Sequence, residues 1–362
     1  MKEKITIGLF YLTLLTFSFL GILTKDKLIS TEERRTLASF PKLEKDNLLN
    51  GEYSSKIDTY LLDQFPLREN FRKIKGIVSN NILLKKENNN VYITNNHLVE
   101  VKSNINYDSL DHFINKINYI NNEYIKENNN LYFMIIPDKN YYINDKLMPK
   151  INYNEFINYL KNKLNYFNYI DITNELNIDS YYKTDIHWKQ ENLEKVVRKI
   201  ENEMNLNKSA FPNIKKEYAP FYGALYSRTV SNIKNDKINY LTNDIINSAE
   251  VYNYEKKTYE KVYNENYLNN IDKYDIYLSG ASPLLIINNP NNQSKKELII
   301  FRDSFASSLA PLLIENYSKI TLIDLRYINS KLLKNIELLD FNNKDILFMY
   351  SIPIINNSFS LK

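Results

Sequence analysis

Short apolar runs alternate with amphipathic helices from residue 110 to the end of the chain, and this alternation constrains the fold more than any other feature. The runs are apolar throughout and have no polar alternation, which is typical of strands buried on both faces of a parallel sheet. They lie at 131–136, 169–172, 298–301, 320–323 and 346–350. Helical spacing predicts helices at 108–126, 154–167, 190–204, 305–317 and 330–339. The order predicts an α/β domain with a mainly parallel sheet and helices on both faces.

Two regions do not follow this order. Residues 207–290, which are rich in tyrosine and asparagine, interrupt it, so we expect an insertion there within a domain at 111–362. Residues 25–110 are charged and mixed and have no repeat, and we interpret them as a membrane-proximal extension. Within this extension, 91–93 followed by Asn95 and Asn96 predicts a strand and a turn.

Residues 5–23 contain no charge and predict an N-terminal signal anchor at 1–24. Nineteen helical residues span about 28 Å, close to the hydrocarbon thickness of a bilayer. A cleaved signal peptide is the alternative, but residues 21–25 offer a poor small-x-small cleavage site. Basic residues follow the segment as well as precede it, so the positive-inside count opposes an outside domain. A long downstream domain translocates largely regardless of charge, and we therefore expect a single-pass membrane protein with its bulk outside the cytoplasm, or a secreted one after cleavage.

Composition excludes several kinds of chemistry. The chain has no cysteine, which rules out disulfides, thiolate metal sites and a cysteine nucleophile. A net charge of +4 without a dominant basic block gives no support to nucleic-acid binding. No glycine-rich phosphate-binding motif is present. We therefore expect no metal, nucleotide or other cofactor.

A first candidate motif, at residues 182–188 (YKTDIHW), contains one of three histidines and the single tryptophan of the chain. Residues i and i+2 of an extended chain point to the same side, so Asp185 can reach the imidazole of His187. Such a carboxylate orients a histidine that acts as a base. The alternative is a loop histidine at a helix start that Asp185 caps.

A second candidate motif, at 298–305 (LIIFRDSF), places Ser304 in a turn between a strand and a helix. A serine there is exposed above the sheet, and the first amides of the helix can bind an oxyanion. The alternative is that Ser304 or Asp303 is an ordinary helix cap. Pro311 is expected to kink the following helix or to restart it.

Other polar and aromatic residues follow the predicted strands, at the edge where ligands bind in such sheets. Lys139 and Arg326 could bind sugar hydroxyls or a carboxylated glycan, or form structural salt bridges. Trp188 could stack on a sugar ring or pack in the core. We interpret His97 and His112, which have no partner in the sequence, as surface residues.

Together the two motifs resemble the DHHW-motif proteins, which are related to the alginate O-acetyltransferase-like, SGNH-hydrolase-like polysaccharide acetylation proteins. Further stretches follow in the order of that family, and they are Glu33-x-Arg35-x-Leu37-Ala38-x-Phe40-Pro41, Gly51-x-Tyr53, Asp63-x-Phe65-Pro66-Leu67-Arg68, Pro137-Asp138-Lys139, Phe221-x-Gly223-x-Leu225-Tyr226 and Asp324-x-Arg326-Tyr327. Two departures stand out. Ile186 occupies the position of the first histidine of the family motif, and Arg302 that of a glycine before Asp-Ser.

The resemblance implies an SGNH-like fold and a Ser304–His187–Asp185 triad. It further implies an oxyanion held by the Ser304 amide and another donor, with Gly223 a candidate, and a substrate site that includes Tyr226. The implied activity is an extracytoplasmic O-acetyltransferase acting on a cell-surface or secreted polysaccharide, with a membrane-bound O-acyltransferase as acetyl donor. The alternatives are a carbohydrate acetylesterase with the same triad, or a non-catalytic component of a polysaccharide export or modification complex.

Overall fold

The computed structural model describes residues 2–30, 32–43, 50–145, 148–229 and 233–362. Parts of the predicted extension (31 and 44–49) and of the predicted insertion (230–232) lie outside the described residues. The chain forms two compact units. The first unit comprises 1–89 and 226–232, and the second comprises 90–225 and 233–362.

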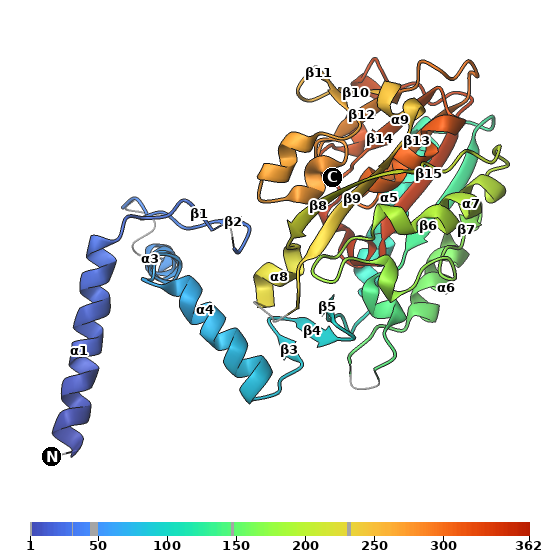
Figure 1. Cartoon of the computed structure of the whole chain (residues 1–362). Coiled ribbons are helices and arrows are strands. Elements are labelled where there is room, and N and C mark those ends of the chain that lie inside the picture. Colours follow the sequence, from blue (N-terminus) through green and yellow to red (C-terminus); the bar gives the residue numbers. More distant parts are fainter. Residues whose placement is uncertain (1, 31, 44–49, 146–147, 230–232) are drawn as a thin grey trace. The chain divides into compact units, whose positions relative to one another are not determined.

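The second unit is built on an eight-stranded sheet (Figure 1). Five neighbouring strands are parallel, in the order β14 (Lys319–Ile323), β13 (Glu297–Arg302), β15 (Asp345–Ser351), β6 (Asn130–Ile136) and β7 (Asn168–Ile170). Three antiparallel strands continue the sheet beyond β14, in the order β12 (Leu284–Asn288), β10 (Glu250–Asn253) and β11 (Thr258–Lys261). The predicted mainly parallel sheet is confirmed.

Both faces of the sheet are covered, because alternate residues of each central strand point to opposite sides. On β13, Leu298 and Ile300 join one buried cluster and Ile299 and Phe301 join the other. The first cluster includes residues of α7 (Glu194–Glu203) and α10 (Ala306–Leu309). The second includes residues of α5 (Tyr107–Tyr124), α6 (Tyr153–Lys163) and α11 (Ile352–Ile355). Each fully buried large apolar side chain contributes about 1.5–3 kcal/mol, so these two layers hold the sheet in place.

Residues 207–290 contribute more to the sheet than an insertion would, because β10, β11 and β12 extend it. The rest of this region forms a separate antiparallel hairpin and two short helices. These elements are β8 (Ile214–Phe221), β9 (Asp236–Thr242), α8 (Ala224–Thr229) and α9 (Asp244–Ser248). A second hairpin, β4 (Val91–Thr94) and β5 (His97–Glu100), turns at Asn95 and Asn96, which both have positive φ. The strand and turn predicted there are confirmed.

The first unit begins with α1 (Lys2–Leu23), which is long and apolar enough to cross a membrane. Its other elements are β1 (Ile29–Ser30), β2 (Arg35–Thr36), α3 (Glu52–Asp63), α4 (Arg68–Ile77), a π-helical turn (Val78–Ile82) and β3 (Glu87–Asn88). Asp63 is buried and accepts hydrogen bonds from Arg35 Nη1 at 2.8 Å and the Ala38 amide at 2.9 Å. Arg35, Ala38 and Asp63, three residues of the stretches that resemble the family, therefore meet at one buried carboxylate.

Candidate active site

Ser304 lies in the turn that leads from β13 to α10, as the sequence predicts. The turn is fixed by Asp303, which is fully buried and whose Oδ1 accepts from the Phe305 amide at 3.0 Å. Its Oδ2 accepts from the Ser351 amide at 2.7 Å, which ties the ends of β13 and β15 together. Asp303 thus caps the turn, and the hydroxyl of Ser304 makes a different contact.

That contact is to His187, whose Nε2 lies 2.7 Å from Ser304 Oγ. The other ring nitrogen, Nδ1, lies 2.6 Å from Asp185 Oδ1, which also accepts from the His187 amide at 3.0 Å. The imidazole stacks on the ring of Tyr274 with centroids 3.9 Å apart and is 9% exposed. The structure therefore brings Ser304, His187 and Asp185 into one hydrogen-bonded row, although Ser304 and His187 are 117 residues apart in sequence.

Asp185 is held by groups from 223–236, which the sequence did not point to as a support. Its Oδ2 accepts from the Ala224 amide at 2.8 Å. Its neighbour Thr184 donates from Oγ1 to Asp236 Oδ2 at 2.6 Å and from its amide to the same oxygen at 2.8 Å. Asp236 and Tyr274 were missed because both lie in the region taken as an insertion, where no motif marks them.

Gly223 has a structural role next to Asp185. A Cβ on Gly223 would lie 2.2 Å from Asp185 Cβ and 2.5 Å from Asp185 Cα, so only glycine fits there. The Gly223 amide donates to Thr184 Oγ1 at 3.0 Å. The geometry therefore does not support the predicted oxyanion role of this amide, whose hydrogen is already used.

A cavity of about 90 Å³ opens beside Ser304. Apolar residues form much of its wall, and they are Val99, Ile186, Leu225, Phe305, Pro353 and Ile354. The polar residues of the lining, besides Ser304, are Glu100, Asp138, Lys139, Asn140, Arg326 and Ser351. Asn140 was not singled out from the sequence, although it directly follows Pro137-Asp138-Lys139. One of its two Nδ2 hydrogens goes to Pro149 O at 3.0 Å, so the second can serve a ligand in the cavity.

Lys139 lines this cavity but is only 3% exposed. Its Nζ donates to the carbonyl oxygens of Tyr182 at 2.9 Å and Lys183 at 3.3 Å, just before the Asp185–His187 pair. Burial lowers the pKa of Lys139 to about 7. Its bonds go to backbone carbonyls rather than to a salt-bridge partner, and they fasten the loop that carries His187.

Arg326 also lines the cavity and is engaged by a neighbour. Its Nε and Nη2 donate to the two carboxylate oxygens of Asp324 at 2.9 and 2.6 Å. This bidentate pair is the structural salt bridge that stood as the alternative to sugar binding.

Trp188 belongs to the core, so its prediction as a substrate-binding residue is wrong. The indole is fully buried, and Nε1 donates to Ser308 Oγ at 2.9 Å and Phe305 O at 3.2 Å. Tyr226 belongs to the first unit and is not among the residues that line the cavity.

Arg302, the departure from the glycine of the family pattern, is not among the residues that line the cavity. It is 1% exposed and donates from Nη1 to Ser307 Oγ at 2.8 Å. Burial lowers its pKa. Because the side chain lies inside the protein, the Asp303–Ser304 turn forms without glycine.

The surface interpretation of the other two histidines is wrong for His97. His97 is 2% exposed, and its Nδ1 lies 2.9 Å from Asn95 O in the hairpin turn. His112 is half-buried with Nδ1 3.0 Å from Ser358 Oγ. Among the described residues, no group of three or more histidine, aspartate or glutamate side chains could hold a metal ion.

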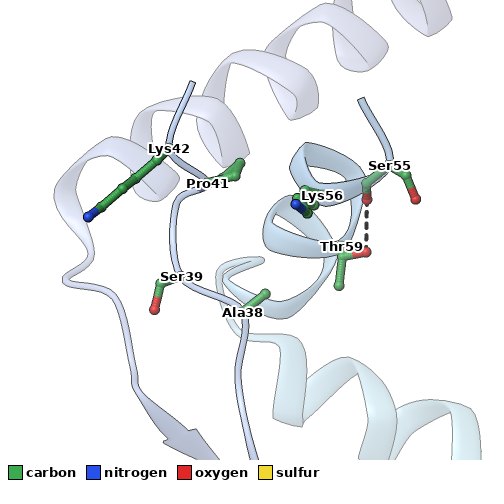
Figure 2. A pocket seen from close by; sticks show the side chains of 7 residues that line it. All are labelled: Ala38, Ser39, Pro41, Lys42, Ser55, Lys56 and Thr59. Atoms are coloured by element: carbon green, nitrogen blue, oxygen red, sulfur yellow. Dashed lines mark hydrogen bonds between the residues drawn. The ribbon is translucent and has the colours of Figure 1, made fainter. Parts of the chain in front are cut away.

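A larger hollow of about 360 Å³ lies in the first unit (Figure 2). It is lined by Ala38, Ser39, Pro41, Lys42, Ser55, Lys56 and Thr59. Thr59 Oγ1 donates to Ser55 O at 2.9 Å, and the lining contains no histidine or carboxylate that could activate a hydroxyl. Size alone therefore does not mark the site, and the chemistry favours the smaller cavity at Ser304.

The fold and the row of three residues define the class, an α/β protein with a mainly parallel sheet and a hydrogen-bonded serine, histidine and aspartate, the serine directly after β13. The sequence matches no protein-family profile and no curated protein. The structure is similar to that of a DHHW family protein from Eubacterium siraeum, with a TM-score of 0.63, 16% identity, and coverage of 76% of this chain and 94% of that one. It is also similar to Bacillus cereus PatB1 with a sulfonyl adduct, with a TM-score of 0.56, 18% identity, and coverage of 73% and 95%. The predicted resemblance to DHHW-motif proteins is thus confirmed at the level of the fold.

Proposed function

We propose that the chain is an extracytoplasmic, serine-dependent O-acetyltransferase that acts on a cell-surface or secreted polysaccharide. The observation that carries the proposal is the row Ser304 Oγ–His187 Nε2–Asp185, with links of 2.7 and 2.6 Å. A hydroxyl, a base within hydrogen-bond reach and a carboxylate that orients the base are the parts of an activated serine nucleophile. The structural neighbours share the fold, and the structure of one of them, PatB1, contains a sulfonyl adduct. Sulfonyl reagents form such adducts with activated hydroxyl groups.

The first half-reaction transfers acetyl to the enzyme. Ser304 Oγ attacks the acetyl carbonyl while His187 Nε2 takes the hydroxyl proton, and Asp185 stabilises the resulting imidazolium. When the tetrahedral intermediate collapses, the bond to the donor oxygen breaks and the donor leaves with the proton from His187. In the second half-reaction a sugar hydroxyl gives its proton to His187 and attacks the acetyl-Ser304 carbonyl, which restores the serine.

The negative oxygen of the intermediate needs donors near Ser304. We assign one donor to the Ser304 amide, in the turn that precedes α10. The second hydrogen of Asn140 Nδ2, in the same cavity, is a better candidate for the other donor than the Gly223 amide, which bonds Thr184. The apolar wall around Ile186 and Leu225 suits the methyl of a short acyl group, since about 90 Å³ leaves little room for a long chain.

The cellular setting follows from α1. A single apolar helix at the N-terminus supports an anchor that places the second unit outside the cytoplasm. Acetyl donors are cytoplasmic, so a transferase outside needs a partner that carries acetyl across the membrane, and we propose a membrane-bound O-acyltransferase. If water replaces the sugar hydroxyl, the same site is an acetylesterase.

The test uses the full chain in detergent with a chromogenic acetyl ester. Wild type should hydrolyse the ester, and Ser304→Ala and His187→Ala should each remove the activity, whereas Ser360→Ala, an exposed serine near the C-terminus, should not. Equal rates in all four proteins would overturn the catalytic role and favour a non-catalytic component. Adding a glycan acceptor and measuring its mass separates the acetyltransferase from the acetylesterase, because only a transferase adds acetyl groups to the glycan.

A further inference from the structure

Large apolar side chains between residues 65 and 84 of the first unit are exposed. Ile74 is 55% exposed, Leu83 55% and Leu84 77%. Ile74 lies in α4, and Leu83 and Leu84 directly follow the π-helical turn that continues this helix. A contiguous exposed apolar patch marks a surface that binds something apolar.

The same segment is amphipathic and basic. Phe71, Ile74 and Ile77 lie at helical spacing on one stripe of α4. Arg68 and Arg72 lie at a different angle on the helix. Between residues 65 and 86 the chain has six basic residues and one acidic residue. An apolar stripe beside basic side chains is the pattern of a helix that lies in the plane of a membrane interface.

The position of the segment beside α1 identifies what covers the stripe. The ring of Phe17 in α1 stacks on Phe65 with centroids 5.2 Å apart and contacts Phe71 at 5.6 Å. Pro66 packs near Gly21, where an added Cβ would lie 3.8 Å from Pro66 Cγ. Phe17 precedes the end of α1 by six residues, or about 9 Å. The apolar stripe of α4 therefore begins alongside the part of α1 that is itself apolar enough to lie in lipid.

We propose that residues 65–84 form a second membrane contact, an interfacial segment whose apolar stripe enters the lipid beside α1. Its partner is the bilayer, with the basic side chains near anionic headgroups. The contact is continuous with the anchor through the Phe17–Phe65–Phe71 cluster, and it holds whether or not Ser304 is catalytic. A second copy of the chain or a protein partner are the other possible occupants, and the experiment below separates them.

The absence of cysteine makes the test direct, because single cysteines can carry a spin label at chosen positions. The full chain is reconstituted in vesicles of three parts phosphatidylcholine to one part phosphatidylglycerol. Ile74→Cys and Ile77→Cys report on the stripe, and Lys75→Cys, which is exposed on the same helix about 100° from Ile74 and about 160° from Ile77, is the matched control. Leu15→Cys in α1 supplies the reference for lipid. Collisions with oxygen, which concentrates in lipid, and with a neutral nickel complex, which stays in water, are measured for each.

The proposal predicts that the labels at Ile74 and Ile77 collide with oxygen and not with nickel, as the label at Leu15 does. The label at Lys75 should collide with nickel. Nickel collisions at all three positions of α4 would overturn the proposal, because the stripe would then face water in the presence of lipid. Protection of Ile74 and Ile77 from both reagents would also overturn it, because protein would then cover the stripe.

Discussion

Replacing Gly223 by alanine should disable Ser304 although none of the three residues of the row is itself substituted. The added methyl would lie 2.2 Å from Asp185 Cβ and 2.5 Å from its Cα, whereas carbon atoms in contact are about 3.5–4.0 Å apart. Asp185 must therefore move by more than about 1 Å, and its backbone must move with it. A displacement of about 1 Å at a catalytic group costs about 100-fold in rate, or about 2.7 kcal/mol of barrier.

The assay measures kcat/KM for an acetyl ester together with the free energy of unfolding in urea. Overpacking of this kind also lowers stability by about 1–3 kcal/mol. Gly280→Ala is the control. Gly280 has a φ of 84°, and the added methyl would clash with the side chain of Asp275 but would meet no residue of the row. It should lose stability and keep its activity. Activity of Gly223→Ala within threefold of wild type would refute the role given to the Gly223–Asp185 contact.

Three further predictions concern the surroundings of the row. Burial lowers the pKa of Lys139 to about 7 from 10.5, so above pH 7 the unfolded chain holds a proton that the folded chain releases. The free energy of unfolding, measured in urea, should therefore rise by about 2 kcal/mol from pH 7 to 9, and Lys139→Met should remove that rise. An equal rise in Lys139→Met would contradict this prediction. Trp188→Phe loses the indole bond to Ser308 and should cost about 1–3 kcal/mol of stability with KM for a glycan acceptor unchanged; a raised KM at full stability would place Trp188 in the substrate site after all. Ile186→Ala should enlarge the cavity and raise the rate with a butyryl ester relative to an acetyl ester; an unchanged ratio would show that Ile186 does not limit acyl length.

The parallel part of the fold could be predicted because each strand is an uninterrupted apolar run, and a run of this kind needs cover on both faces. β13 and β15 match the predicted runs closely. The helix predicted at 305–317 begins as expected but continues as a 3₁₀ helix from Ala310 to Asn316, with Pro311 at its start. The antiparallel strands β10 and β11 were not predicted, since their sequences are mixed and resemble loops. β12 is an apolar run of the kind that predicts a strand, but it lies within the region interpreted as an insertion.

The row of three residues could be predicted because D-x-H and the strand-to-helix serine have local signatures. What supports the row could not be predicted, because it depends on contacts between distant segments. Asp236 bonds Thr184 across 52 residues, and Gly223, singled out only as a candidate oxyanion donor, instead packs on Asp185. Trp188 was ambiguous because an indole suits either a sugar or a core, and only burial decides between them.

The most direct test of the central claim is to identify the residue that an aryl sulfonyl fluoride modifies in the full chain, by peptide mass spectrometry. The account predicts a single adduct on Ser304, formed rapidly in wild type and at a greatly reduced rate in His187→Ala, because the imidazole 2.7 Å away activates the hydroxyl. Modification of another serine, or equal rates of labelling with and without His187, would contradict it.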